Sequence, residues 1–201
     1  MKKWISLLLA GLCALLPFTA LGEADFSMLE AMENASVYLD DDGVTSVVRP
    51  GNQPFLAVTE TEGVTVCAFL DAVEDANLGL TLLRFSLTVE AEDNTWGREL
   101  RLKVGKKTYV FPVVPRISEY DMVYQEDYSV CLTGVSLPMV KQMAADRRGV
   151  YEFELVGEYP VRGTLTMPAQ SVKPLYDLYA ASGALKQDFA QAEALYPCGV
   201  E

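Results

Sequence analysis

The sequence contains no histidine in its 201 residues. Ser-His-Asp and Cys-His mechanisms need an imidazole that takes up and returns a proton, so the sequence excludes both. His-ligated zinc and iron sites are excluded for the same reason. The sequence also lacks a glycine-rich phosphate loop, a dinucleotide fingerprint and a G-x-S-x-G nucleophile motif. The remaining possibilities are carboxylate chemistry, a lysine-assisted serine, or a thiol activated without histidine.

Cysteine is scarce, with 4 in the whole chain, and one of these, Cys13, lies in the N-terminal apolar run. The other three are an odd number, which allows at most one internal disulfide. Cys67 and Cys131 lie in apolar, strand-like runs, and Cys198 lies near the C-terminus. We therefore favour free structural thiols, with a bridge between Cys67 and Cys131 as the alternative. No spacing resembles a zinc site, and we predict no metal or cofactor.

The only long apolar run is at the N-terminus, over residues 5–16. Lys2 and Lys3 precede it, and small residues follow it up to Gly22, which is the pattern of a signal peptide. We predict a signal peptide at 1–22, with cleavage after Gly22, or alternatively after Ala24. The run is too short for a comfortable membrane span, so we expect no stable span after cleavage. The short positive start is typical of bacteria, and the predicted location is secreted or in the cell envelope.

Positive charge is in short supply, because 16 Lys and Arg face 28 Asp and Glu, for a net charge of −12. Removal of Lys2 and Lys3 with the signal peptide lowers the net charge to about −14. Such a surface repels nucleic acid and anionic lipid, so neither is an expected partner. The residues 23–201 are enough for a single domain with a sizeable core.

Several cues agree on a short helix over about 136–148. Ser136 is a suitable N-cap, and Pro138 is tolerated in the first turn. Arg147 and Arg148 suit the carbonyl end of the helix dipole, and Gly149 suits the left-handed C′ position.

Alternating apolar and polar residues elsewhere predict strands, because one face of each would be buried. The expected strands are 36–39, 44–49, 55–59, 64–70, 80–89, 100–104, 108–114, 128–132, 151–155 and 159–167.

The segments between these strands complete the expected fold. We expect an acidic loop at 71–79 and an irregular connection at 116–126. Helical spacing of apolar residues predicts a helix at 25–33 and C-terminal helices within 172–196. The fold class is therefore α+β, with antiparallel β-sandwich-like sheets flanked by a few helices.

The order of these features resembles that of certain uncharacterised exported bacterial proteins. The likeness lies in the Lys106-Lys107 hairpin that ends in a Tyr-containing strand, the segments 136–149 and 151–155, and a C-terminal helix with Tyr176 and Tyr179. It covers roughly residues 78–185. It implies a similar build of sheet and helices, and it implies no activity and no site residues.

Four aromatic residues are the candidate ligand-binding residues. Tyr120, Tyr124 and Tyr128 recur at every fourth position, so on one extended strand their rings would share a face. Trp96 lies in a polar segment and is a further exposed candidate. Aromatic platforms beside acidic acceptors suit sugars or peptides, which makes a protein or a glycan the expected partner. Core packing or an edge row of aromatic residues is the alternative.

A second candidate is a basic patch on one hairpin of an otherwise acidic protein. Its members are Arg98, Arg101, Lys103, Lys106 and Lys107. The patch could bind an anion or a partner. Alternatively, it could be a solvated strand face whose positive charges balance those of nearby acidic residues.

Acidic clusters offer weaker candidates. The turn at Asp40–Gly43 lacks the alternating ligands and distant glutamate of a calcium loop. Glu152, Glu154 and Glu158 could form a carboxylate pair, but alternation points the first two at solvent. The sequence therefore favours an exported, non-enzymatic binding or scaffolding module. A carboxylate-dependent hydrolase or an inert structural domain is the alternative.

Overall fold

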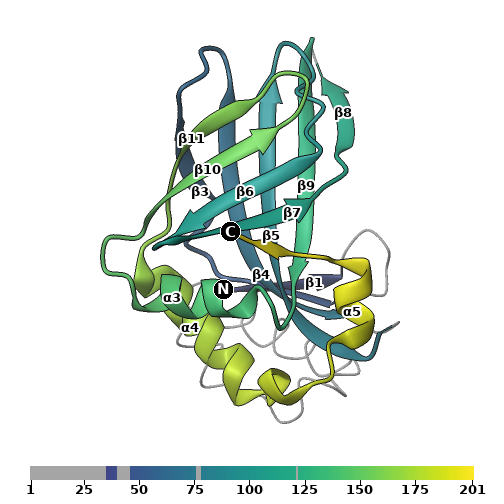
Figure 1. Ribbon diagram of the computed structural model, residues 1–201, viewed down its shortest axis with the longest axis vertical. Helices are drawn as coiled ribbons and strands as arrows, with labels where there is room; N and C mark the ends of the chain where they lie inside the picture. Colours follow the sequence, from purple (N-terminus) through teal and green to yellow (C-terminus); the bar gives the residue numbers. More distant parts are fainter. Residues whose placement is uncertain (1–34, 40–45, 76–77, 121) are drawn as a thin grey trace, which may run out of the picture.

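The computed structural model describes residues 35–39, 46–75, 78–120 and 122–201 (Figure 1). The predicted signal peptide at 1–22, the predicted helix at 25–33 and the turn at 40–43 lie outside these residues.

Within the described residues, strands and a few helices follow one another along the chain. The strands are β1 (Ser36–Leu39), β2 (Ser46–Arg49), β3 (Phe55–Thr59), β4 (Thr65–Asp75), β5 (Leu80–Ala91), β6 (Glu99–Val104), β7 (Lys107–Pro112), β8 (Arg116–Tyr120), β9 (Val123–Leu132), β10 (Val150–Val156), β11 (Val161–Thr166) and β12 (Gly199–Val200). The helices are α3 (Leu137–Ala145), α4 (Ala169–Ala181), the short 3-10 helix η1 (Ala184–Lys186) and α5 (Ala190–Leu195).

The strands form one curled antiparallel sheet. Its hydrogen-bonded order is β12-β7-β6-β10-β11-β3-β4-β5-β9-β8, with β2 paired to β4 and β1 paired to β2. In Figure 1, β6, β7, β10 and β11 cross in front of β4, β5 and β9. The predicted mostly antiparallel sheet is confirmed, whereas the predicted sandwich is replaced by a half-barrel. The reason is β3, which pairs with both layers: Leu56 lies opposite Cys67 of β4, and Ala57 lies opposite Leu165 of β11.

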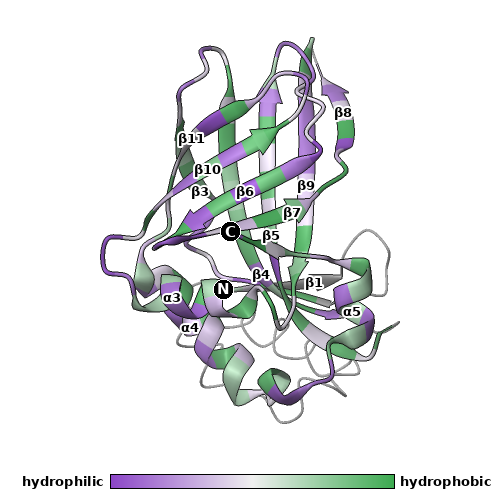
Figure 2. Ribbon diagram, viewed as in Figure 1, coloured by the Kyte–Doolittle hydropathy of each residue, from purple (hydrophilic) through white to green (hydrophobic). Residues whose placement is uncertain are grey.

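The hydrophobic core fills the inside of this curl. Along β5, Leu83, Phe85 and Leu87 are buried, and Arg84 and Ser86 alternate with them on the outer face. Figure 2 shows the same alternation of apolar and polar residues on the strands of the front layer. Because the side chains of a strand point to opposite faces in turn, strands such as β5, β6 and β10 contribute every second residue to the core. The predicted alternation on β5 is therefore confirmed.

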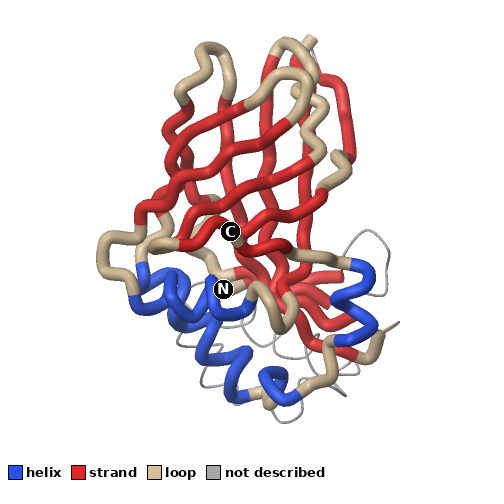
Figure 3. Tube along the Cα trace, in the orientation of Figure 1, coloured by secondary structure: helices blue, strands red, loops and turns tan. Residues whose placement is uncertain are grey.

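Helices α3 and α4 lie together at one end of the curl (Figure 3). The predicted short helix is present, but α3 ends at Ala145, so Arg147 lies beyond its last turn. Ser136 occupies the N-cap position, yet its Oγ accepts a hydrogen bond from Thr133 N–H (2.9 Å) and caps no helical N–H. Gly149 does have a positive φ of 58°, at the start of β10 rather than at the helix end, where an added Cβ would lie 2.6 Å from the Met167 carbonyl oxygen.

Two segments predicted as loops are strands. β4 continues through Asp71 to Asp75, where we expected an acidic loop, because Asp71 has ionic partners that let a carboxylate be buried. Residues 116–120 form β8 and residues 123–126 begin β9, and the two strands pair as a hairpin. No helix in the described part of the chain is long and apolar enough to cross a membrane.

Candidate functional site

A cleft of about 340 Å³ lies beside Trp96, in the segment between β5 and β6. This segment is at the end of the sheet that is remote from α3 and α4 (Figure 1). The lining is mainly apolar, with one guanidinium and one carboxylate: Trp96, Gly97, Arg98, Val113, Val114, Pro115, Ile117 and Glu158. Trp96 is 46% exposed and Val114 is 86% exposed, so large apolar groups face solvent here. Exposed aromatic and aliphatic groups around a concavity are typical of a binding site.

A buried carboxylate behind the cleft holds the Trp96 segment in place. The Glu126 side chain is only 1% exposed, and it receives hydrogen bonds from the backbone of the segment. Its Oε1 accepts from Thr95 N–H (2.8 Å) and from Trp96 N–H (3.2 Å). Its Oε2 is hydrogen-bonded to the hydroxyls of Thr95 and Tyr128. These four bonds satisfy a carboxylate that would otherwise be costly to bury.

Tyr128 extends this network under the cleft. Its hydroxyl accepts a hydrogen bond from Gly97 N–H (3.0 Å) and lies 3.0 Å from Thr95 Oγ1. Burial raises the pKa of the Tyr128 phenol, and the hydrogen bond to Glu126 raises this pKa further. The phenol is therefore neutral at physiological pH, and it can donate its proton to the carboxylate.

The backbone around Trp96 is tightly constrained. Trp96 has a φ of 50°, a left-handed conformation that is unusual for a bulky residue. A Cβ added to Gly97 would lie 2.6 Å from Leu155 Cδ1 and 2.7 Å from the Tyr128 hydroxyl. The hydrogen bonds of Glu126 thus hold the backbone in a conformation that turns the indole toward solvent.

The structure separates the three tyrosines that we expected on one strand. Tyr120 is on β8 and 79% exposed, Tyr124 is on β9 and half-buried, and Tyr128 is on β9 and 1% exposed. A turn at Met122, with a φ of 65°, lies between Tyr120 and Tyr124. Tyr120 lies opposite Val123 in the register, so it shares the face of Val123, whereas Tyr124 and Tyr128 share the opposite face of β9.

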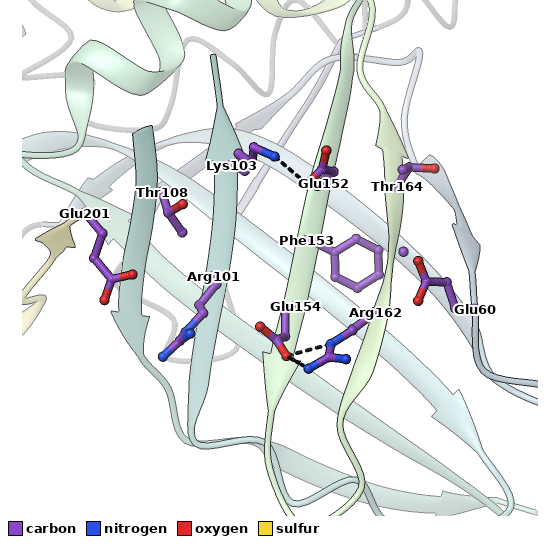
Figure 4. Close-up of a pocket in the computed structure, with 11 residues that line it drawn as sticks. Glu60, Arg101, Lys103, Thr108, Glu152, Phe153, Glu154, Arg162, Thr164 and Glu201 are labelled. Carbon is purple, nitrogen blue, oxygen red and sulfur yellow. Dashed lines mark hydrogen bonds and ion pairs between the residues drawn. The ribbon is translucent and has the colours of Figure 1, made fainter. Parts of the chain in front are cut away.

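The residues of the predicted basic patch lie in three different places. Arg98 lines the Trp96 cleft, and Lys106 and Lys107 are exposed at the turn between β6 and β7. Arg101 and Lys103 face outward from β6, over a second hollow of about 360 Å³ (Figure 4).

Acidic residues form ion pairs with the basic groups of this second hollow. Arg101 Nε lies 2.6 Å from Glu99 Oε1, and Lys103 Nζ lies 2.8 Å from Glu152 Oε2. Arg162 and Glu154 form a further ion pair, drawn as dashed lines in Figure 4. The basic residues here therefore act largely as one side of an ion-pair ladder across β6, β10 and β11.

Two of the three acidic candidates, Glu152 and Glu154, line the second hollow together with Glu60 and Glu201, and the third does not (Figure 4). Glu152 and Glu154 are ion-paired with Lys103 and Arg162, and Glu158 is the one carboxylate that lines the Trp96 cleft. No group of three or more Cys, Asp or Glu among the described residues could hold a metal ion. No disulfide joins Cys67, Cys131 and Cys198, the cysteines that the structure describes.

Sequence reasoning missed the role of Glu126, although a signal was present. Tyr124, Glu126 and Tyr128 alternate along one strand, so the periodicity that places Tyr128 inward also places Glu126 inward. It also missed Asp71, which follows an apolar run and was read as the start of a loop. In both cases an inward or buried carboxylate signals a polar network that needs partners from distant parts of the chain.

The chain matches no family model, no curated protein and no solved structure.

Proposed function

We propose that this protein is an exported, non-enzymatic binding module of the bacterial cell envelope or extracellular space, and that it binds a protein partner through the Trp96 cleft. The observation that carries the proposal is the indole itself, which is 46% exposed while its backbone is held by a buried carboxylate. A residue whose backbone is already held in place loses less conformational entropy when it binds, and tryptophan is enriched among the dominant residues of interfaces.

The lining of the cleft favours an apolar side chain over a sugar. Its walls are the indole and the side chains of Val113, Val114 and Ile117, and its charged groups are Arg98 and Glu158. Sugars need many hydrogen-bond partners around an aromatic face, whereas an apolar anchor of a protein needs a mainly apolar pocket. A protein that inserts one aliphatic or aromatic side chain beside Trp96 therefore fits the cleft best.

Export supports the same function. The N-terminal pattern that predicts a signal peptide at 1–22 would direct the protein to a compartment where binding modules are common, and the absence of histidine narrows the catalytic options. A hydrolase would need two carboxylates that face one another across a cleft. If the protein were an inert structural domain, no ligand would bind in the Trp96 cleft.

Selection of peptides that bind this protein tests the proposal. The sequence has 2 tryptophans, and Trp4 lies in the predicted signal peptide, so in a protein that begins at Glu23 the fluorescence reports on Trp96 alone. We expect a library of random displayed peptides to yield binders with a shared apolar residue, and we expect these peptides to shift the emission of Trp96. Trp96→Ala should weaken their binding by about tenfold or more, as expected for a central anchor.

Two further variants test whether a loss of binding is specific to the Trp96 cleft. Val114→Ser changes an 86% exposed residue of the cleft, and Val58→Ser changes a 73% exposed residue on β3 as its matched control. Weaker binding in the first and unchanged binding in the second supports the cleft. Peptides that bind the Trp96→Ala variant as tightly as the parent chain contradict the proposal, and selective binding on a glycan array would replace the protein partner by a glycan.

A further inference from the structure

β8 ends the strand order of the sheet, and its only paired neighbour in the described part of the chain is β9 (Figure 1). All five of its residues are exposed, and no backbone hydrogen bond joins residues 117–120 to a described segment other than β9. In an antiparallel pair, every second residue directs its N–H and C=O away from the neighbouring strand. The outer border of β8 therefore presents backbone donors and acceptors on which another strand can form.

This border runs directly into the Trp96 cleft. Ile117 of β8 lines the cleft, together with Val114 and Pro115, which precede β8. In the register, Ile117 lies opposite Glu126, so its side chain is on the inner face of the sheet, where Glu126 holds the Trp96 backbone. A strand that pairs with β8 would therefore place the residue opposite Ile117 beside the indole.

Glu119 provides a second position of recognition. It lies two residues after Ile117 on β8, so the two side chains share a face. Glu119 is exposed, and its carboxylate forms no ion pair or hydrogen bond among the described residues. Opposite charges at directly paired positions stabilise a sheet. An added strand therefore fits best when it carries a lysine or arginine opposite Glu119 and an apolar residue opposite Ile117.

A second copy of this chain fits the border less well. If two β8 strands paired antiparallel about Ser118, Ile117 of each copy would lie opposite Glu119 of the other, which places an apolar group against a charge. A register about Glu119 would put two carboxylates directly opposite each other. A register about Ile117 would bring in Pro115, which has no N–H to donate. A strand of another sequence avoids these conflicts.

We propose that the protein partner of the Trp96 cleft binds as an extended segment that adds an antiparallel strand to β8, with a basic side chain opposite Glu119 and an apolar side chain opposite Ile117. Main-chain hydrogen bonds hold the segment, and the cleft selects its apolar residue. Antiparallel pairing is slightly more stable per residue than parallel pairing. This binding mode rests on the proposed function, which supplies the apolar anchor, and adds the pairing with β8.

Two synthetic peptides test the binding mode. The first, acetyl-Thr-Thr-Lys-Thr-Phe-Thr-Thr-amide, has its basic and apolar residues in the antiparallel order, and the second, acetyl-Thr-Thr-Phe-Thr-Lys-Thr-Thr-amide, has them reversed. We expect the first peptide to bind more tightly and to shift the emission of Trp96. At saturation it should slow amide hydrogen exchange at alternate residues of β8 by about fivefold or more, because these amides gain a hydrogen bond. Tighter binding of the second peptide contradicts the antiparallel orientation.

N-methylation of the first peptide tests the main-chain hydrogen bonds separately. The N–H groups of alternate peptide residues point toward β8 in the proposed pairing. Methylation of one alternate set should weaken binding by about fivefold for each lost hydrogen bond, and methylation of the residues between them should have a smaller effect. Equal effects along the whole peptide contradict strand pairing.

Glu119→Lys tests the charge pairing, with Glu62→Lys as its matched control. Both glutamates are exposed, but Glu62 lies on the turn between β3 and β4, away from β8 in the sheet order. Glu119→Lys should weaken binding of the first peptide by about threefold, and a peptide with Glu in place of Lys should restore it. Glu62→Lys should leave binding unchanged. Equal weakening by both variants shows an effect of net charge and contradicts pairing at Glu119.

The outcomes separate this binding mode from the proposed function. A shift of Trp96 emission without slowed exchange in β8 supports the cleft and overturns the added strand. Slowed exchange in β8 that Trp96→Ala leaves unchanged supports the added strand and contradicts the cleft as the anchor. If the peptides produce neither effect, the added strand is overturned, and the displayed library decides the proposed function separately. Dimers that dissociate when the peptide binds would replace the partner segment by a second copy.

Discussion

The Trp96 cleft and the charged hollow of Figure 4 have similar volumes, about 340 and 360 Å³, but they use their polar groups in opposite ways. In the charged hollow, acids and bases stand on the surface and pair with one another, as Lys103 does with Glu152. In the cleft, the polar network of Glu126 lies behind the surface, and mainly apolar side chains face outward.

The two sites therefore differ in the position of their polar groups rather than in their volume. A surface ion pair contributes little and is easily replaced by water, whereas a buried carboxylate must keep its partners. The network behind the cleft therefore fixes a conformation, and the ladder on the charged face mainly keeps that face soluble. The following predictions separate the two regions, from the largest effect to the smallest.

Glu126→Ala should have the largest effect. The substitution leaves the N–H groups of Thr95 and Trp96 and the hydroxyl of Tyr128 without their acceptor inside the protein. We expect the free energy of unfolding to fall by about 3 kcal/mol, because several buried donors lose one charged partner. Urea denaturation measures this change. The matched control is Glu152→Ala, at a 66% exposed side chain, which should cost about 0.5 kcal/mol or less. Similar losses in the two variants contradict the distinction between the regions.

Alkaline pH should weaken the support of the cleft. Burial raises the pKa of Tyr128 in the folded protein, so the unfolded chain ionises first, near pH 10. The stabilisation is complete below about pH 10, and above it the free energy of unfolding falls by about 1.4 kcal/mol per pH unit for each such tyrosine. Tyr151, whose pKa burial raises to about 12, adds to the same trend.

The Tyr128→Phe variant isolates the contribution of one phenol to this trend. It should be less stable at neutral pH, because it lacks the hydroxyl that meets Glu126 and Gly97, but its stability should fall less steeply between pH 10 and 11.5. Urea unfolding at a series of pH values gives both slopes. Parallel curves for the two proteins show that Tyr128 does not ionise on unfolding in this range.

Lys103→Gln should have the smallest effect. Its ion pair with Glu152 joins side chains that are 50% and 66% exposed, so the free energy of unfolding should change by about 0.5 kcal/mol or less. Thermal unfolding at low and high salt measures it, and the small difference from the parent chain should vanish at high salt. A loss as large as that of Glu126→Ala shows that the ladder is structural.

Much of the strand pattern could be predicted from the sequence, because alternation along a segment such as 80–89 records which face is buried. The curl of the sheet could not, since it depends on β3 pairing with β4 and β11, which lie on either side of it in space but far apart in the chain. Alternation failed at Asp71 because a buried carboxylate looks polar in the sequence until its arginine partners are known.

The candidate site was only partly predictable. Trp96 and Arg98 were among the predicted candidates, but the walls at Val113–Ile117 reach them only through the folding of β7 and β8. Tyr124 and Tyr128 do share a face, as period two requires. Tyr120 does not, because the turn at Met122 reverses the chain before β9 begins.

The two ends of the strand order that runs from β12 to β8 are unequal. At one border, Gly199–Val200 pair with Tyr109 and Val110, so β7 is covered by a strand only two residues long. At the other, β8 presents five exposed residues, from Arg116 to Tyr120. The backbone of β8 is therefore the longer of these two borders, and the exposed side chains along it are what distinguish it from the border at β7.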